Sequence, residues 1–413
     1  MSEKGKSTSG SIGAWFGDER VRGKIAQGLV IFFLLLLVSF LVHNTSQNID
    51  SRGIKTGWGF LSQPAGYDVL FKIVEFDSTY SHGRIFFVGI LNTLLVSAIG
   101  IVLATFLGFF VGVLRLSNNW LVSKIAYVYI DIIRNIPLLV QLLLWYSIFL
   151  FLPKIQESYT AFSFYLSNAG VNMPAPSIGA STGLMPFNVG FLPESMGWSA
   201  FLVVLIAGAV GFFSTRWVKN WGKRKMEATG ERPPVVLLSL ITAILVPILI
   251  VLFFAWPIGL DLPKANNFGR LKGGTTVPAE FLVLLLGLTI YTSAFIAEIV
   301  RSGIMAVSKG QTEAASSLGL KKSWTLNLIV IPQAMRVIVP PLTSQYLNLT
   351  KNSSLAVAIG YPDIVATIGG TTLNQTGQAI ECIAMTMLVY LVISLSISTV
   401  MNIYNRRIAL VER

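Results

Sequence analysis

Continuous apolar blocks of about twenty residues are the feature that most constrains this sequence. A bilayer core about 30 Å thick takes a helix of about 20 residues, and a helix satisfies its backbone hydrogen bonds internally. The sequence therefore predicts an all-α integral membrane protein with about eight transmembrane helices. The blocks are Ile25–Val42, Ile85–Leu114, Tyr127–Leu152, Trp198–Arg216, Val235–Trp256, Ala279–Val300, Arg336–Ala358 and Ile380–Tyr404.

Composition agrees with a membrane protein and argues against other classes. Only 12% of the 413 residues are charged, against roughly a quarter in a soluble domain. The net charge of +12 could indicate nucleic acid, but Lys and Arg accumulate in cytoplasmic loops of membrane proteins, so no nucleic-acid partner is expected. One cysteine and two histidines without ligand spacing predict no metal site. Without a catalytic or nucleotide-binding motif, neither an enzyme nor a bound cofactor is expected.

The distribution of basic residues predicts the orientation. If the N-terminus is inside and the spans alternate, 21 of the 31 Lys and Arg residues lie inside and eight lie outside, with Arg134 and Lys351 within spans. Positive residues concentrate on the cytoplasmic side of a membrane. Both termini are therefore expected in the cytoplasm, together with the loop between residues 301 and 336.

One polar stretch of that loop, "EAASSLGLKKSWTLNLIVIP" from Glu313 to Pro332, is too broken to cross a bilayer. Ser308 and Gln311 fit a capping box, and Gly319 suits the left-handed residue that ends a helix. These signals predict a helix of about ten residues, which is marginal in water and needs a partner surface. A second short helix follows, which Pro332 should end or kink. The plainer alternative is a loop helix that rests on its own bundle.

The same stretch resembles the cytoplasmic loop signature of permease subunits of ABC importers. In that family, the loop helix docks into a cleft of a separate ATP-binding subunit. The resemblance implies that this loop couples the chain to an ATPase dimer, on which ATP and magnesium would bind, and that the chain itself binds no cofactor. The matching residues are Glu313, Ala314, Ala315, Gly319, Ile329 and Pro332, with Ile331 in place of the usual leucine.

Four further stretches resemble the polar amino-acid uptake branch of that family. The resemblance covers about 85–152 and 279–405, which would form a five-helix permease core, and the added spans look like the larger permeases of general L-amino acid importers of Gram-negative bacteria. It implies a bacterial inner-membrane importer of L-amino acids, either polar ones or a broad range, with a paralogous permease as partner in a heterodimer and a periplasmic amino-acid-binding protein. The stretches are "NTLLVSAIGIVLATFLGFFVGVLRLS" from Asn92, "YIDIIRNIPLLVQLLLWY" from Tyr129, "YTSAFIAEIVRSGI" from Tyr291 and "LTKNSSLAVAIGYPDIV" from Leu349.

The spans and the resemblance together divide the chain into five parts. Residues 1–84 hold the N-terminal tail, the first transmembrane helix and a periplasmic segment. Residues 85–152 and 279–405 are the two parts of the permease core, and the second carries the coupling loop. Residues 153–278 are an insertion with a periplasmic loop and two extra transmembrane helices, and 406–413 form a cytoplasmic tail.

Polar residues inside the spans predict a substrate path. Charges within a membrane are costly, and they usually face the protein interior or a pathway. A polar lining suits a zwitterionic amino acid, whose ammonium and carboxylate need partners once water is removed. Two alternatives stay open, since Lys351 could pair with an acidic group of the partner permease and Glu298 could form an interfacial pair with Arg301. The candidates are Glu298, Asn348, Lys351, Asn352, Ser353 and Ser354.

Other polar residues bear on the remaining alternatives. Arg134, near the start of the third span, should either snorkel or pair with Asp131. A stand-alone ion- or proton-driven amino-acid carrier would need a carboxylate relay, for which Asp131 and Glu298 are the candidates. A subunit that binds the ATPase but forms no path is a third possibility. The "YPDI" sequence from Tyr361 predicts an outside turn or a short re-entrant helix.

Overall fold

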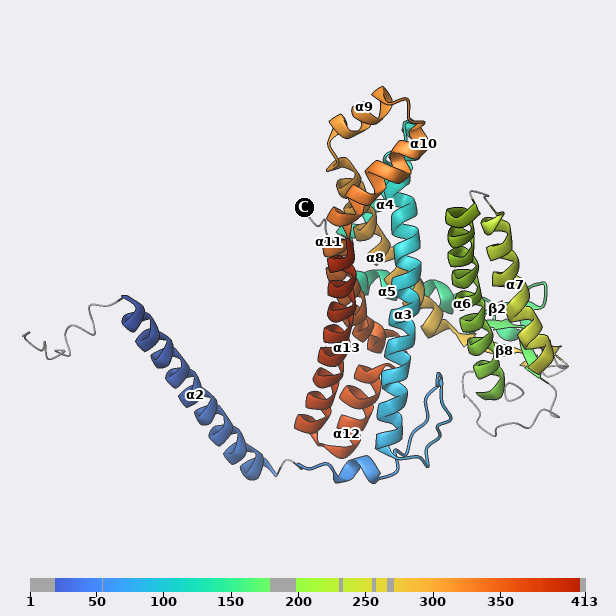
Figure 1. Cartoon of the computed structure of the whole chain (residues 1–413). Helices are drawn as coiled ribbons and strands as arrows, with labels where there is room; N and C mark the ends of the chain where they lie inside the picture. The colour runs from blue at the N-terminus through green and yellow to red at the C-terminus, as the bar shows by residue number, and fades with distance from the viewer. Residues whose placement is uncertain are drawn as a thin grey trace, which may run out of the picture. The chain divides into compact units, whose positions relative to one another are not determined.

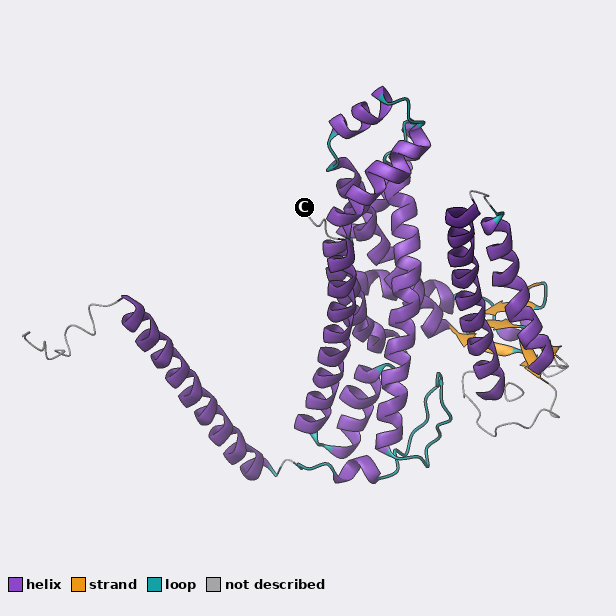
Figure 2. Ribbon diagram, in the orientation of Figure 1, coloured by secondary structure: helices purple, strands orange, loops and turns teal. Residues whose placement is uncertain are grey.

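The computed structural model describes residues 19–53, 55–178, 198–229, 233–254, 258–265 and 271–408. Most of these residues are helical (Figures 1 and 2). Five helices are long and apolar enough to cross a membrane, or six if one bent pair is a single span. The predicted all-α membrane fold is confirmed, whereas the number of eight spans stays a prediction. The long candidates are Arg22–Ile49, His82–Arg115, Ala279–Met305, Ser323–Ile359 and Ala379–Arg407.

The N-terminal helix α2 forms a compact unit of its own. It runs over Glu19–Arg52 and includes the predicted first span with extra turns at both ends. Most of the N-terminal tail lies outside the described residues, but positions 19–23 belong to this helix. The second unit begins at Trp58, after Gly57 with a φ of +113°.

The core of the second unit is the pairing of α3 (His82–Arg115) with α8 (Ala279–Met305). Glycines on α3 let the two backbones approach closely. A Cβ atom at Gly108 would lie 2.6 Å from Ile296 Cβ and 2.9 Å from the Ser293 carbonyl oxygen. Close approach between small residues is the usual way for helices to associate in lipid. This packing fixes the position of the C-terminal half of α8, which carries several of the candidate site residues.

The third predicted span is not one straight helix. It consists of α4 (Trp120–Asn135) and α5 (Leu138–Leu150), which meet at an angle of 105°. Pro137 explains the break, because it cannot donate an intrahelical hydrogen bond and it drives Ile136 into an extended conformation, with φ −102° and ψ 129°. The prediction of an unbroken span over Tyr127–Leu152 is therefore wrong.

The second half of the core consists of two long helices and the short helical segments that precede, connect and follow the first of them. It comprises α9 (Lys309–Ser317), α10 (Lys322–Thr325), a π-helical turn (Leu326–Val330), α11 (Ile331–Asn352) and a 3-10 segment (Ser353–Ile359). A π-helical segment (Val365–Thr372), α12 (Leu373–Thr376) and α13 (Ala379–Ile408) complete it. Figure 1 shows α9 and α10 at one end of the bundle and α12 at the other.

The sequence predicts that Pro332 either ends or kinks the second short helix, and of these two outcomes the end is wrong. Pro332 occupies the start of α11, which continues through Pro340 and Pro341. Because Pro332 has no N–H, it cannot bond to the carbonyl four residues earlier, and the widened turn at Leu326–Val330 lies immediately before it. Within this helical stretch, the proline marks a local opening of the hydrogen-bond pattern instead of an end.

The "YPDI" segment is buried, so the predicted outside turn is wrong, whereas the alternative of a short re-entrant helix stays a prediction. Tyr361 and Asp363 are fully buried, and the Tyr361 hydroxyl donates to the Asn92 carbonyl oxygen at 3.0 Å. Asn92 in turn donates to the Pro362 carbonyl oxygen at 2.9 Å, and the Ile364 N–H donates to Thr93 Oγ1 at 3.1 Å. Polar residues of α3 thus satisfy the backbone of this irregular segment inside the bundle.

The predicted insertion contains a small antiparallel sheet that the sequence analysis does not anticipate. Strand β3 (Gly170–Met173), near its beginning, pairs with β8 (Thr275–Pro278) at its end, with Gly170 opposite Pro278. The two ends of the insertion therefore lie side by side, and β8 leads directly into α8. The sheet order is β1 (Tyr159–Ala161), β2 (Phe164–Ser167), β3 and β8.

The rest of the insertion is a helical hairpin with short strands. Helices α6 (Trp198–Thr229) and α7 (Val235–Phe254) pack on each other. Strand β4 (Ala175–Ile178) pairs with β5 (Ile258–Asp261), and β6 (Lys264–Ala265) pairs with β7 (Leu271–Lys272). Residues 179–197 of the predicted periplasmic loop lie outside the described residues.

Candidate functional site

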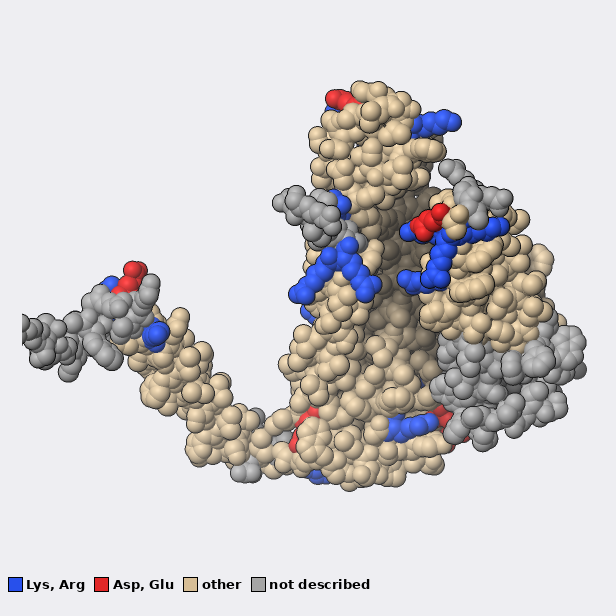
Figure 3. Space-filling view, in the orientation of Figure 1, with Lys and Arg blue, Asp and Glu red and all other residues tan. Residues whose placement is uncertain are grey.

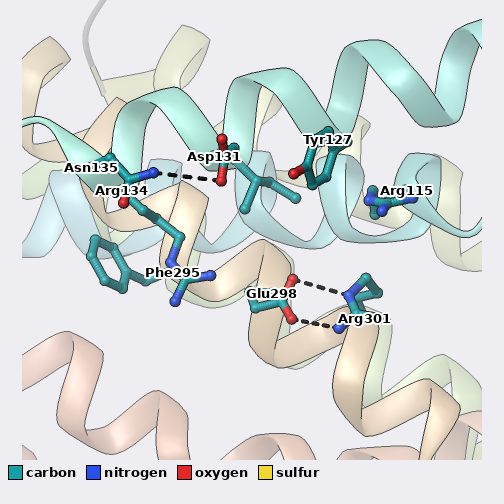
Figure 4. Close-up of a pocket in the computed structure, with 9 residues that line it drawn as sticks. Arg115, Tyr127, Asp131, Arg134, Asn135, Phe295, Glu298 and Arg301 are labelled. Atoms are coloured by element: carbon teal, nitrogen blue, oxygen red, sulfur yellow. Dashed lines mark hydrogen bonds and ion pairs between the residues drawn. The ribbon is translucent and has the colours of Figure 1, made fainter.

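A polar cavity of about 430 Å³ lies between α4 and α8 (Figure 4). It contains three arginines and two carboxylates, together with tyrosine, asparagine and apolar side chains. Its lining residues are Arg115, Tyr127, Ile130, Asp131, Arg134, Asn135, Phe295, Glu298 and Arg301. Of the predicted substrate-path residues, Glu298 is the one that lines this cavity.

Helical spacing brings these side chains to one place. Tyr127, Asp131 and Arg134 lie three or four positions apart on α4, and Phe295, Glu298 and Arg301 do so on α8, so each set shares a helix face. Asn119 caps α4, because its side chain accepts from the backbone N–H groups of Leu121 and Val122.

The charges in the cavity are unevenly paired. Glu298 and Arg301 form a two-point ion pair, with distances of 2.6 and 3.0 Å between nitrogen and oxygen atoms. The predicted interfacial pair is therefore present. The sequence predicts that Arg134 either snorkels or pairs with Asp131. It forms no ion pair with Asp131, and its guanidinium lies over the Phe295 ring, 5.2 Å from the centroid. Asp131 instead accepts a long hydrogen bond of 3.5 Å from Asn135.

The other predicted path residues lie elsewhere, at the C-terminal end of α11. Asn348 and Lys351 are exposed, and Asn352 ends the helix. Ser353 and Ser354 belong to the following 3-10 segment, where their hydroxyls donate to the carbonyl oxygens of Thr350 and Lys351, both at 2.7 Å. The α-helix ends at this run, but the run still lies within the candidate span Ser323–Ile359, so its place in a substrate path stays a prediction. No residue from 348 to 354 is among the described residues that line the α4–α8 cavity.

Helix α9 is built as the sequence predicts at its C-terminal end. Gly319 has a φ of +71°, the Gly319 N–H donates to the Ser316 carbonyl oxygen and the Leu320 N–H donates to that of Ala315. This pair of bonds is a Schellman motif. At the other end, Ser308 is the N-cap residue but its side chain makes no cap hydrogen bond, so the predicted capping box is wrong.

Most residues of the predicted coupling helix are exposed, and one buried residue, Ala315, packs it against the rest of the chain. Ala315 is 1% exposed, whereas Glu313 and Ala314 face outward with Leu318, which is 80% exposed. The Gln311 side chain accepts a hydrogen bond of 3.3 Å from Gln333, which ties α9 to the start of α11. Ile329 lies in the π-helical turn and Pro332 at the start of α11.

Metal-binding side chains are not grouped in the described ranges. No set of three or more His, Cys, Asp or Glu residues there could hold a metal ion.

Sequence comparison identifies the family. Residues 200–410, just over half of the chain, match the family described as "Binding-protein-dependent transport system inner membrane component". The chain is 45% identical, over the full length of both proteins, to the putative amino-acid ABC transporter permease protein YhdX of Escherichia coli K12. This chain belongs to that family.

Two other relatives cover nearly the whole length of this permease. The general L-amino acid transport system permease protein AapQ of Rhizobium johnstonii is 42% identical over 96% of this chain and 94% of its own length. The glutamate/glutamine/aspartate/asparagine transport system permease protein BztB of Rhodobacter capsulatus is 42% identical over 96% of each chain.

Family membership confirms several predictions. The chain is a multi-pass inner-membrane permease subunit of an ABC importer, which works with an ATPase subunit and a binding protein. It is not itself an enzyme, and the alternative of a stand-alone carrier is excluded.

The roles of some residues in this permease were not predicted from the sequence. Asn92 and Thr93 hold the buried segment around Tyr361, but on sequence alone they are two polar residues in an apolar helix. Arg115 lies in the cavity, but in the sequence it is one of the basic residues that follow an apolar block. An available signal was the three- and four-residue spacing of Tyr127, Asp131 and Arg134 on one face of α4.

Proposed function

We propose that this permease carries L-amino acids from the periplasm to the cytoplasm, and that polar amino acids are its main substrates. The α4–α8 cavity is the observation that carries the proposal. Arg134 could receive the α-carboxylate, because it forms no ion pair in the described part of the chain, and Asp131 and Glu298 could receive the ammonium group. Both charges of a zwitterion would then have partners after it loses water. The printed names of YhdX, AapQ and BztB support an amino-acid substrate.

A second, exposed set of polar residues is proposed to extend this path. Lys351 is exposed at the end of α11, and its side chain has no hydrogen-bond or ion-pair partner among the described residues. A lysine in that state within a candidate span needs a substrate carboxylate, water or an acidic partner. Asn348, Asn352, Ser353 and Ser354 would add neutral hydrogen-bonding groups around it.

Coupling is proposed to run through the exposed loop. Glu313, Ala314, Ala315, Gly319, Ile329 and Pro332 would present α9 to a cleft of an ATPase dimer, which binds ATP and magnesium. Helix α9 meets the requirements, because it is short, slim and exposed on its outer face. This role needs the α9 end of the bundle in the cytoplasm, in agreement with the predicted cytoplasmic termini. A paralogous permease would complete a heterodimer.

Uptake into proteoliposomes tests the substrate and the role of Lys351. The complete complex with its ATPase and binding protein should take up labelled L-amino acids, and unlabelled L-amino acids should compete while sugars should not. Loss of a hydrogen bond to a charged group costs roughly 1.5–3 kcal/mol, so Lys351→Ala should reduce uptake at limiting substrate about tenfold or more. Lys55→Ala, at an exposed residue outside the spans, is the control.

Two outcomes would count against the proposal. Competition by sugars as strong as that by amino acids would reject the substrate class. Full uptake by Lys351→Ala would remove that residue from the path, and it would leave the α4–α8 cavity to be tested separately.

A further inference from the structure

The sequence predicts that α6 and α7 both cross the membrane, and α6 is then longer than the bilayer core that α7 fits. The 20 residues of α7 extend over about 30 Å, the thickness of a bilayer core, and they include no charged residue. The 32 residues of α6 extend over about 48 Å. One end of α6 must therefore lie in the headgroup layer and beyond it.

The packing of the hairpin shows which end this is. Gly222 of α6 lies against Val235, the first residue of α7, and Gly211 lies against Pro247, where a Cβ atom would be 2.5 Å from Cγ of the proline. In this antiparallel register, the start of α7 is level with Gly222. The membrane surface is then close to Gly222, and the last two turns of α6 lie outside the hydrocarbon core.

Cationic residues are concentrated at this level. Between positions 216 and 229, α6 has five Lys or Arg residues and one acidic residue, Glu227. The ion pair between Lys223 and Glu227 is long, at 4.0 Å, and both side chains are more than 60% exposed. Figure 3 shows basic side chains gathered near the end of the hairpin where α6 ends and α7 begins. The cations are Arg216, Lys219, Lys223, Arg224 and Lys225.

Exposed tryptophans stand beside the cations. Val218 and Gly222 are buried and face α7, which leaves the adjacent faces of α6 open. Trp217 is 69% exposed and Trp221 is 40% exposed, and Lys225 Nζ lies 5.7 Å from the Trp221 ring centroid. Tryptophan prefers the membrane–water interface, where its ring is in an apolar layer and its N–H can donate to polar groups.

We propose that this cation–tryptophan face, defined by Arg216, Trp217, Lys219, Trp221, Lys223 and Arg224, binds the headgroups of anionic phospholipids. Lys223 and Arg224 lie just beyond Gly222, and Arg216 and Lys219 lie one to two turns before it, from where their long side chains can reach the headgroup layer. Ammonium and guanidinium groups at this level attract phosphate-bearing lipids, and each contributes to membrane affinity. Exposed tryptophans at the same level favour a lipid surface over a soluble acidic protein, because a water-facing helix end would gain nothing from them. The insertion would thus fix the depth of the permease and select the lipids around it.

Lipid retention tests this site on the assembled transporter. The purified complex should be exchanged into nanodiscs of phosphatidylcholine with about 10% phosphatidylglycerol, and co-purified lipid should be counted by native mass spectrometry. The wild type should enrich phosphatidylglycerol over the bulk ratio. The triple change Lys219→Gln, Lys223→Gln, Arg224→Gln should reduce that enrichment about tenfold, since each cation contributes separately. Arg406→Gln with Arg407→Gln, at the end of α13, removes two cations elsewhere and should leave most of the enrichment.

Two further arms separate the explanations. Lys219→Arg with Lys223→Arg keeps the charges and should retain phosphatidylglycerol as the wild type does, and assembly of the Gln variant with its ATPase subunit excludes a folding defect. Equal enrichment in the wild type and the Gln triple variant would overturn the proposal. Loss of the ATPase subunit from the Gln variant with lipid enrichment unchanged would also overturn it, in favour of a protein partner for this face.

Discussion

Gly319→Pro is expected to abolish amino-acid-stimulated ATP hydrolysis of the complex while the permease still inserts into the membrane. Gly319 has a φ of +71°, which proline cannot adopt because its ring fixes φ near −65°. The change also removes the N–H that donates to the Ser316 carbonyl oxygen at 2.9 Å. A nine-residue helix without its C-terminal cap does not persist in water. Stimulated and basal ATPase rates of the reconstituted complex measure the effect.

Gly310→Ala is the matched control for this prediction. Gly310 also lies in α9, but a Cβ atom there would have an ordinary contact, 3.5 Å from the Ser308 hydroxyl. Alanine favours a helix by about 1 kcal/mol over glycine, so stimulation should be retained. Normal stimulation in Gly319→Pro would show that α9 does not transmit the closure of the ATPase.

Arg134→Gln is expected to raise the KM for amino-acid uptake at least tenfold and to leave basal ATP hydrolysis close to that of the wild type. Arg134 lies in the α4–α8 cavity over Phe295 and forms no ion pair within 4 Å among the described residues, although it interacts with the Glu298 carboxylate at longer range. Removing a charged hydrogen-bond donor from a substrate carboxylate costs roughly 1.5–3 kcal/mol. Glu298→Gln should also impair uptake. It removes a carboxylate from the cavity and, in addition, the negative charge of the 2.6 Å ion pair with Arg301.

Initial uptake rates over a range of substrate concentrations measure this prediction. Lys124→Gln provides a control on the same helix, because Lys124 lies over the Tyr127 ring at 5.1 Å but does not line the cavity. Arg134→Lys keeps a positive charge and should recover part of the affinity. An unchanged KM in Arg134→Gln would exclude the cavity as the site of the substrate carboxylate.

Local signals in the sequence were enough to predict the long helices and the end of the coupling helix. The cap at Gly319 is a local property, because only the residues on either side determine whether a left-handed glycine ends a helix. The Glu298–Arg301 pair was also predictable from its three-residue spacing on α8. The capping box at Ser308 was wrong because a non-local partner, Gln333, takes the Gln311 side chain.

The remaining features depend on contacts that are distant in sequence. The buried position of Asp363 and Tyr361 follows from hydrogen bonds to α3, about 270 residues earlier in the chain. Strands of the insertion are two to four residues long, and β3 pairs with β8 across about 100 residues, so the sequence offers no periodic signal for this sheet. Pro137 is a local signal for a break in the third span. The angle of 105° also depends on the packing of α5 against α8, which is distant in sequence.

The central claim is that closure of the ATPase moves α9 and thereby changes the α4–α8 cavity. Spin labels at Trp120→Cys and Met305→Cys, both exposed at the ends of these helices, report on that cavity in a Cys382→Ser background. Pulsed electron paramagnetic resonance on the complex should show an ATP-dependent change in the distance between the labels, and the change should disappear in Gly319→Pro while ATP still binds. The same ATP-dependent change in Gly319→Pro, or none in the parent protein, would contradict the account.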